Sequence, residues 1–310
     1  MDVMRSVLLA ASDSRWLRRN APKVGFIRRA VTRFMPGEDA DAALDAAQAL
    51  APEGIGTVFT NLGENVADLA EAEGVTRHYL DLLDQIAARG LSSEISIKLT
   101  QLGLDIDAAQ CRANVRRLVE RADALGTYIW IDMEQHSYVD ATLELYHAVR
   151  AEFPKVGVCL QAYLYRTPKD LEAVIAVGGG VRLVKGAYRE PASVAFPKKG
   201  DVDAAYLTLA KRMLDTDARA AGFDPVFGTH DQQMVQAIQR HANASGVPRD
   251  GYEFALLYGI QRSVQQQLAR DGYGIRVLIS YGAYWFPWYM RRLAERPANV
   301  WFVVRTMFAR

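Results

Sequence analysis

Short apolar runs alternate along the chain with longer segments whose apolar residues recur at helical spacing. Runs such as EISIKLTQLG (94–103) and TYIWIDMEQ (127–135) are rich in β-branched residues, which is typical of buried strands. The segment ADLAEAEGVTRHYLDLLDQIAARG (67–90) has apolar residues three and four positions apart and ends on a glycine, which predicts a helix. Eight strands are expected, at 56–64, 94–103, 127–135, 156–165, 180–188, 224–231, 251–259 and 274–282.

Eight strand–helix repeats of this kind predict a parallel sheet covered by helices. Eight strands are also the number that closes a (β/α)8 TIM-type barrel, which needs about 250 residues. The chain has 310 residues, so we expect residues 51–310 to form the barrel and residues 1–50 to form a helical segment packed on it. A doubly wound open sheet is the alternative, but no GxGxxG follows the first expected strand.

The composition is that of an ordinary globular protein, with 50% hydrophobic and 24% charged residues. The net charge of only +1 argues against a surface built to bind nucleic acid. The two cysteines, Cys111 and Cys159, form neither a disulfide framework nor a metal-spaced pair, so a reducing compartment is expected. We expect no membrane span and no signal peptide, because the apolar runs are too short.

Basic residues are concentrated near the start of the chain. Residues 1–35 contain eight Lys or Arg and two Asp, interleaved with aromatic and aliphatic residues such as Trp16 and Phe26. A basic, amphipathic segment of this kind can bind an anionic membrane surface. From this feature alone, a helical cap that packs its apolar face on the main domain is the simpler interpretation.

Polar side chains gather at the C-terminal ends of the expected strands, where barrel enzymes have their active sites. A purely structural protein would have less reason to place them there. They are Glu64, Lys98, Asp132, Glu134, Gln161, Arg182, Lys185, Thr229 and His230.

A last helix is expected within WFPWYMRRLAERPANVWFVV (285–304). Arg291, Arg292 and Glu295 fall on or beside one face of it. Because this helix follows the eighth strand, it can bend over the barrel mouth, where two guanidinium groups could grip one carboxylate. The alternative is a solvent-exposed face whose salt bridges stabilise only weakly.

Three motifs together resemble the proline dehydrogenases: RRLAERPAN (291–299), LVKGAY (183–188) and SIKLTQLG (96–103). The resemblance extends from about Thr57 to Phe302. It implies a distorted barrel with FAD at the strand ends, oxidation of L-proline to Δ1-pyrroline-5-carboxylate, and transfer of the electrons to a membrane quinone. The length fits the monofunctional bacterial form. Such an enzyme is cytoplasmic, peripheral on the inner face of the cell membrane, and hands its product to a pyrroline-5-carboxylate dehydrogenase.

The resemblance also assigns a substrate site residue by residue. Arg291, Arg292 and Lys98 match the groups that bind the substrate carboxylate, and a buried carboxylate does need compensating cations. Asp132 matches an aspartate of the pocket whose partner could be Lys98. Together with Arg182 and Glu295, Lys98 and Asp132 are the expected catalytic residues.

Two acidic residues border the expected site. Glu295 matches a glutamate that lines the pocket and also contacts the cofactor. Glu64 matches the partner of the first arginine, so a Glu64–Arg291 ion pair would act as a gate.

On the cofactor side, Arg182 matches an arginine beside flavin N5, where a cation favours electron density arriving on the ring. Gln161 matches a glutamine that binds the pyrimidine edge of the flavin, and Thr229 and His230 match a pair that contacts the cofactor after the sixth strand. The flavin-contacting turn is matched by Val184, Lys185, Gly186, Ala187 and Tyr188, and its glycine permits close approach of the backbone.

Two positions depart from the family pattern. Many members have a tyrosine in the eighth strand where VLISYG has Leu278. We expect Leu278 to line the substrate site together with Tyr281, which is near but out of register. Many also have a glutamine in the seventh strand where EFALL has Ala255, and Gln261 could replace its contact with the flavin.

Two other functions fit the residues without the resemblance. Lys98 or Lys185 at a strand end could attack a carbonyl, as in a Schiff-base aldolase. The same cations could serve a non-catalytic binder of small carboxylates. Colour separates the aldolase from the flavoprotein, because only the flavoprotein is yellow.

Overall fold

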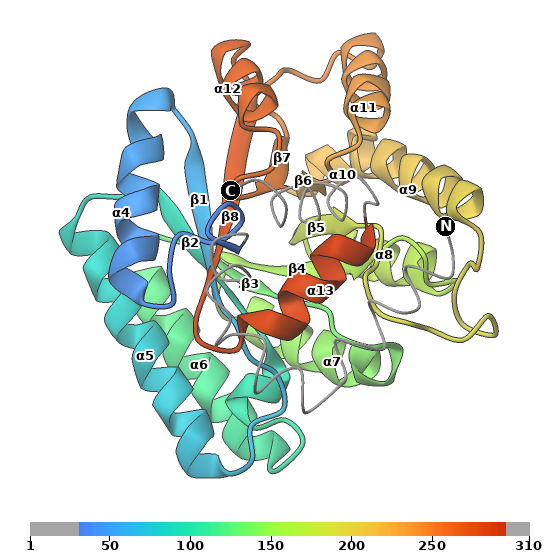
Figure 1. Ribbon diagram of the computed structural model, residues 1–310. Helices are drawn as coiled ribbons and strands as arrows, with labels where there is room; N and C mark the ends of the chain where they lie inside the picture. Colours follow the sequence, from blue (N-terminus) through green and yellow to red (C-terminus); the bar gives the residue numbers. More distant parts are fainter. Residues whose placement is uncertain (1–30, 296–310) are drawn as a thin grey trace.

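The computed structural model describes residues 31–295, with side chains up to residue 290 (Figure 1). Its eight strands are all parallel to their neighbours and close into a barrel in the order β1 to β8. Strand β8 returns to β1 in a register that runs from Gly56↔Arg276 to Asn61↔Tyr281. The predicted TIM-type barrel is confirmed, and the open sheet is excluded. The strands are β1 Gly56–Asn61, β2 Ser93–Ile97, β3 Ile129–Ile131, β4 Val156–Gln161, β5 Gly180–Val184, β6 Asp224–Gly228, β7 Glu253–Leu257 and β8 Gly274–Tyr281.

Each predicted strand is present, but each is shorter than the run that predicted it. The run at 94–103 becomes β2 followed by a short 3-10 helix, Leu99–Leu102, which ends at Gly103 with a φ of +96°. The polar residues in the C-terminal part of each run lie where the backbone leaves the sheet and turns into a loop. These loops carry the candidate site.

The helices form a layer around the barrel (Figure 1). They are α4 Ala40–Leu50, α5 Leu69–Ala88, α6 Ala108–Ala124, α7 Val139–Arg150, α8 Thr167–Ile175, α9 Lys199–Met213, α10 Thr216–Ala220, α11 Gln232–Ala244, α12 Arg262–Arg270 and α13 Trp285–Glu295. Aspartates cap several of them. At the start of α5, Asp68 accepts from the Glu71 N–H (2.9 Å) while the Glu71 carboxylate accepts from the Ala67 N–H (2.8 Å). This reciprocal pair fixes where α5 begins, just beyond the end of β1.

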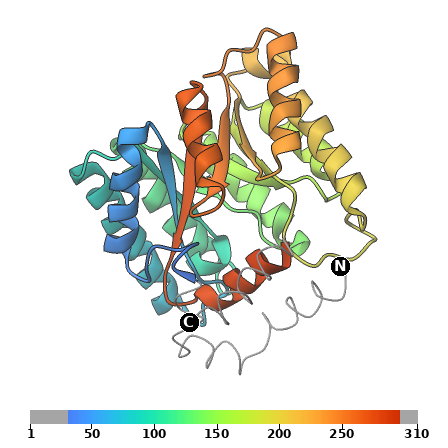
Figure 2. The same ribbon diagram turned by 45° about the horizontal axis from the view of Figure 1, so that its top comes forward.

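Helix α4 packs against both β8 and β1, so it closes the helical layer where those two strands meet. Helix α13, which follows β8, instead lies at one end of the barrel (Figure 2). Its aromatic residues pack against Leu62, just after β1, and against a segment that includes Val31 and Phe34. The predicted last helix at the mouth and the packing of an N-terminal helix on the barrel are confirmed, whereas the boundary at residues 50 and 51 stays a prediction.

Side chains of each strand alternate between the helix-facing core and the barrel interior. Inside the barrel, an apolar layer built on Val58, Trp130 and Val226 lies between two sets of ionic groups. Lys98 and Asp132 lie on its C-terminal side. Toward the N-terminal ends of the strands, Arg276 pairs with Glu94 and Glu253.

Most of the basic segment 1–35 lies outside the described residues. Within residues 31–295, no helix is both long and apolar enough to cross a bilayer.

Candidate active site

Three charged side chains from three strands meet inside the barrel, near the C-terminal ends of the strands. Lys98, directly after β2, places its Nζ 3.2 Å from Asp132 Oδ2 and donates to Thr60 Oγ1 at 3.3 Å. Arg182 of β5 pairs with the other oxygen of Asp132. Ser96 Oγ donates to Asp132 (2.8 Å) and lies 2.7 Å from Arg182 Nη2. The strand-end rule therefore brought together residues that are truly in contact, and the expected Lys98–Asp132 partnership is confirmed.

The protonation of this cluster follows from its charges. Burial alone would raise the pKa of Asp132, but Lys98 and Arg182 outweigh it, so the pKa is lowered. Burial alone would lower the pKa of Lys98, but the attraction of Asp132, together with that of Tyr79, Glu64 and Glu134, outweighs it, so the pKa is raised. Two cations then face one carboxylate, and the three groups together carry one net positive charge. Such a site favours an anion, as a substrate carboxylate would be.

The same geometry weakens the aldolase alternative. A lysine that forms a Schiff base must first be neutral. Lys98 is held in its charged form by Asp132. Lys185 places its Nζ 2.6 Å from Asp203 and 3.4 Å from Asp231, so two carboxylates already engage the atom that would have to attack a carbonyl.

The turn after β5 contacts the loop after β4 and the loop after β1. Gly186 has a φ of +110°, and a Cβ there would lie 2.3 Å from the ring of Tyr163, which belongs to the loop after β4. Tyr188 donates to Glu64, after β1, at 3.3 Å. The close approach that requires glycine in this structure is thus to Tyr163, a partner that the sequence did not reveal.

Gln161, at the end of β4, has a fixed orientation. Its Nε2 donates to the carbonyls of Met133 (3.1 Å) and Glu134 (3.2 Å), which leaves Oε1 as an acceptor. That oxygen is buried and has no hydrogen-bond partner among the described residues. A buried acceptor without a partner is costly, so it suits the N–H of a bound group. The pyrimidine edge of a flavin offers such an N–H, and in this respect the site fits the cofactor that the resemblance implies.

Thr229 and His230 follow β6, as predicted, and both engage backbone groups. The Asp231 N–H donates to Thr229 Oγ1 at 3.1 Å, and the Leu257 N–H donates to His230 Nε2 at 3.2 Å. Val184 is half-buried at the end of β5, and Ala187 lies in the turn that follows it.

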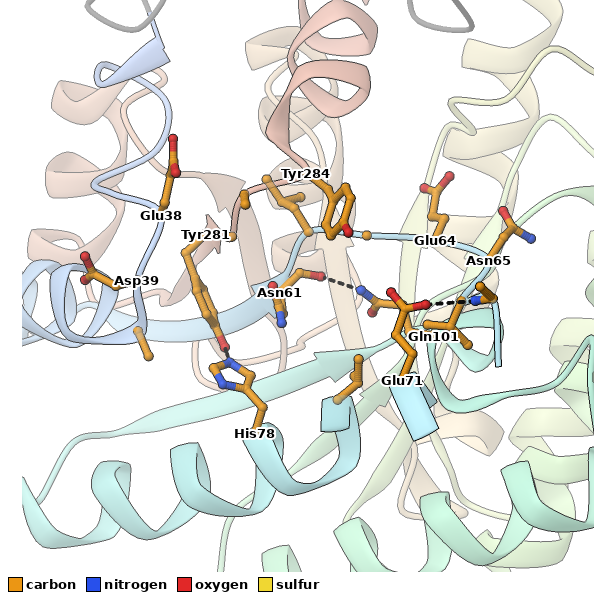
Figure 3. Close-up of a pocket in the computed structure, with 18 residues that line it drawn as sticks. Glu38, Asp39, Asn61, Glu64, Asn65, Glu71, His78, Gln101, Tyr281 and Tyr284 are labelled. Atoms are coloured by element: carbon orange, nitrogen blue, oxygen red, sulfur yellow. Dashed lines mark hydrogen bonds between the residues drawn. The ribbon is translucent and has the colours of Figure 1, made fainter. Parts of the chain in front are cut away.

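Leu278 and Tyr281 lie on opposite faces of β8. Leu278 faces the barrel interior, beside Val58 and Trp130. Tyr281 faces the helical layer, where its hydroxyl lies 2.7 Å from Nε2 of His78 on α5 (Figure 3). The expectation that Tyr281 lines the substrate site was wrong. Side chains three positions apart along a strand point to opposite faces.

The backbone of α13 carries Arg291, Arg292 and Glu295, but their side chains lie outside the described part. The start of α13 is firmly anchored. Trp285 is buried and donates from its indole to Glu38 at 3.1 Å. Whether a Glu64–Arg291 pair forms, and whether Glu295 lines the pocket, therefore stay predictions.

A cavity of about 630 Å³ lies beside the mouth, between the ends of β1 and β8 and the starts of α4 and α5 (Figure 3). Four carboxylates line it, those of Glu38, Asp39, Glu64 and Glu71. Asp39 and Glu71 bind backbone N–H groups at the starts of α4 and α5, and Glu38 accepts from an indole. Helix capping thus accounts for two of the four carboxylates, Asp39 and Glu71, and the Lys98 cluster is not among the residues that line the cavity.

Ser96 and Thr60 are polar neighbours of the cluster that the sequence reasoning missed. Ser96 lies two positions before Lys98 in EISIK, on the same face of β2. The alternation of a strand was the signal that could have found it.

Residues 43–305 match the family model described as proline dehydrogenase. The chain is 35% identical over 303 residues to proline dehydrogenase 1 of Bacillus subtilis subsp. natto, with 98% of each chain covered. It is 38% identical over 280 residues to a proline dehydrogenase of Deinococcus radiodurans, with 89% of each covered. Among solved structures, proline utilization A from Bdellovibrio bacteriovorus, inactivated by N-propargylglycine, matches with a TM-score of 0.79 and 23% identity. That match covers 87% of this chain and 33% of the longer one, and it supports the barrel fold.

Proposed function

The chain belongs to the proline dehydrogenase family, and we propose that it oxidises L-proline to Δ1-pyrroline-5-carboxylate, with FAD as the hydride acceptor and a membrane quinone as the final electron acceptor. The observation that carries the proposal is the buried cluster of Lys98, Asp132 and Arg182 at the strand ends, with its net positive charge. Within this family, such a cluster suits the carboxylate of an amino acid.

Lys98 binds the substrate carboxylate in its charged form, together with Arg291 and Arg292 of α13. Asp132 does not face the carboxylate. It holds Lys98 and Arg182 in place, and its negative charge offsets one of the two cations while the site is empty of substrate. Leu278 offers an apolar surface inside the barrel for the proline ring.

The oxidation forms a double bond between the nitrogen and C5 of proline. C5 loses a hydride and the nitrogen loses a proton, so the amine must be neutral before the hydride can leave. A bound FAD supplies the hydride acceptor for this chemistry. The residues that would hold it are Gln161, Arg182, the turn Val184–Tyr188, Thr229, His230 and Glu295.

The orientation of Gln161 and the charge of Arg182 support this assignment. Gln161 Oε1 is left as an acceptor for a cofactor N–H. Arg182 keeps a positive charge, because the attraction of Asp132 contributes to raising its pKa even though burial lowers it. A cation at this place stabilises negative charge that arrives on a neighbouring ring.

Glu64 and Arg291 would link the loop after β1 to the last helix as a gate over the site. The basic stretch 1–35 would bring the enzyme to the inner face of the cell membrane, where the quinone is found. The product would pass to a pyrroline-5-carboxylate dehydrogenase.

The proposal is tested by the absorption spectrum of the purified protein and its response to L-proline without oxygen. We expect a flavin spectrum that L-proline bleaches. A flavin spectrum that L-proline leaves unchanged, although L-proline binds, would favour the non-catalytic carboxylate binder. A colourless protein that borohydride traps with a carbonyl substrate would favour the aldolase.

A further inference from the structure

The indole of Trp130 lies against Arg182 in the barrel interior. The guanidinium carbon of Arg182 is 5.3 Å from the centroid of the ring, and both side chains are buried. A cation over an indole face is attracted by the electrons of the ring, and the attraction is stronger when water is excluded. Trp130 thus contacts the cation whose other contacts, Asp132 and Ser96, form part of the candidate active site.

The orientation of the indole is fixed from the opposite side. Its Nε1–H donates to Glu94 Oε2 at 2.7 Å. The other oxygen of Glu94 lies 3.0 Å from Arg276, which in turn places its Nε 2.7 Å from Glu253. A buried carboxylate with a second partner therefore determines which way the ring faces.

Space for the ring is built into two neighbouring strands. A Cβ at Gly157 of β4 would lie 2.5 Å from Cζ3 of Trp130. A Cβ at Gly180 of β5 would lie 2.1 Å from the hydroxyl of Tyr128, whose ring lies beside that of Trp130 at a centroid distance of 4.8 Å. Neither glycine has a positive φ, so their role is to admit the two rings and not to turn the backbone.

We propose that Trp130 is a positioning residue for the reaction: its ring holds the guanidinium of Arg182 against Asp132 and Ser96, and Glu94 fixes the ring. The inference rests on the proposed function, in which Arg182 lies beside the cofactor. Without the ring, the long side chain of Arg182 gains freedom and has a competing buried carboxylate, Glu94, on the N-terminal side of the layer. Trp130 both fills the path between them and supports Arg182.

A double-mutant cycle tests the contact without reference to activity. The variants are Trp130→Leu, Arg182→Met and the double variant, and the measurement is denaturant unfolding. We expect the effects of the two substitutions on the unfolding equilibrium constant to be coupled by on the order of 10-fold, as a desolvated cation–π contact would give. If the change in the unfolding equilibrium constant of the double variant is simply the product of the changes in the two single variants, the inference is overturned. If Trp130→Leu does not fold, Trp130→Met takes its place in the cycle, because it also removes the aromatic face.

The rate of flavin reduction by L-proline tests the positioning role. We expect Trp130→Leu to slow it by on the order of 10-fold, while Trp130→Phe, which keeps an aromatic face, recovers most of the rate. The KM for proline should change much less than kcat, because Lys98 and its arginine partners still bind the carboxylate. Tyr128→Phe is the matched control, since it alters the neighbouring ring without touching Arg182, and it should behave as the unmodified protein.

Coupling in the cycle with an unchanged rate in Trp130→Leu would mean that the contact only stabilises the fold, which contradicts the positioning role. Failure of the unmodified protein to be reduced by L-proline would contradict the proposed function instead. In that case the cycle alone would still decide whether Trp130 holds Arg182.

Discussion

Replacing Asp132 by asparagine should destabilise the fold more than any comparable change at the surface. Asp132 accepts from Ser96 at 2.8 Å and from Lys98 at 3.2 Å, and it also pairs with Arg182. Asparagine keeps the size but not the charge, so two buried cations would face each other without an anion. Removing one partner of a buried ion pair costs about 3–5 kcal/mol.

Asp140→Asn is the matched control. Asp140 lies 2.7 Å from Arg166, but its side chain is 87% exposed, against 18% for Asp132. An exposed pair of this kind contributes about 0–1 kcal/mol. Urea unfolding of the three proteins, followed by circular dichroism, gives the two differences in free energy of unfolding. A loss in Asp132→Asn no greater than that in Asp140→Asn would refute the reasoning that Asp132 compensates buried charge.

The effect of Asp132 should also depend on pH in a defined direction. Lys98 and Arg182 lower its pKa in the folded protein despite burial, which raises it. Unfolded aspartate has a pKa of about 3.9, so the ionised group stabilises the fold above about pH 4. That contribution is lost as the pH falls through the lower folded pKa. The difference in free energy of unfolding between the unmodified protein and Asp132→Asn should therefore be constant from about pH 5 to 8. It should become smaller below about pH 4.

Three further outcomes are expected. Arg291→Met or Arg292→Met should raise the KM for proline without reducing flavin content, since losing a charged hydrogen bond in a closed site costs about 2–4 kcal/mol. Unchanged KM values in both variants would show that the two arginines do not bind the substrate carboxylate. Arg182→Ala should impair flavin reduction or retention in stopped-flow and spectral measurements, whereas Lys169→Ala, exposed on α8, should change neither; equal behaviour would separate Arg182 from the flavin. The basic stretch 1–35 should bind anionic vesicles at low salt and release them at high salt, at roughly 1 kcal/mol per basic residue, and equal sedimentation with neutral vesicles would rule out electrostatic docking.

The barrel could be predicted because its signals are local. Apolar runs at regular intervals predict eight strands, and the strand-end rule then places Lys98, Asp132 and Arg182 at one mouth, where the structure has them in contact. The face of Tyr281 was predictable by the same logic. It lies three positions from Leu278, and an odd separation puts two residues of one strand on opposite faces.

Contacts between residues on different strands could not be predicted from the sequence, because they depend on how the closed barrel arranges the strands. Arg276 and Glu94 are far apart in the sequence, and nothing local marks them as a buried pair. The rings that exclude a side chain at Gly157 become visible only once β3 and β4 lie side by side. The position of α4 between β8 and β1 likewise follows from the closure of the barrel.

The binding of the substrate carboxylate by the cationic cluster is tested most directly by comparing two inhibitors in a dye-coupled assay. Tetrahydro-2-furoate keeps the ring and carboxylate of proline but has oxygen in place of nitrogen, and pyrrolidine keeps the ring and amine but lacks the carboxylate. We expect tetrahydro-2-furoate to compete with proline and pyrrolidine to inhibit at least roughly 100-fold more weakly, because pyrrolidine has no carboxylate to accept hydrogen bonds from Lys98, Arg291 and Arg292. Equal inhibition constants for the two compounds would show that Lys98, Arg291 and Arg292 do not anchor the substrate.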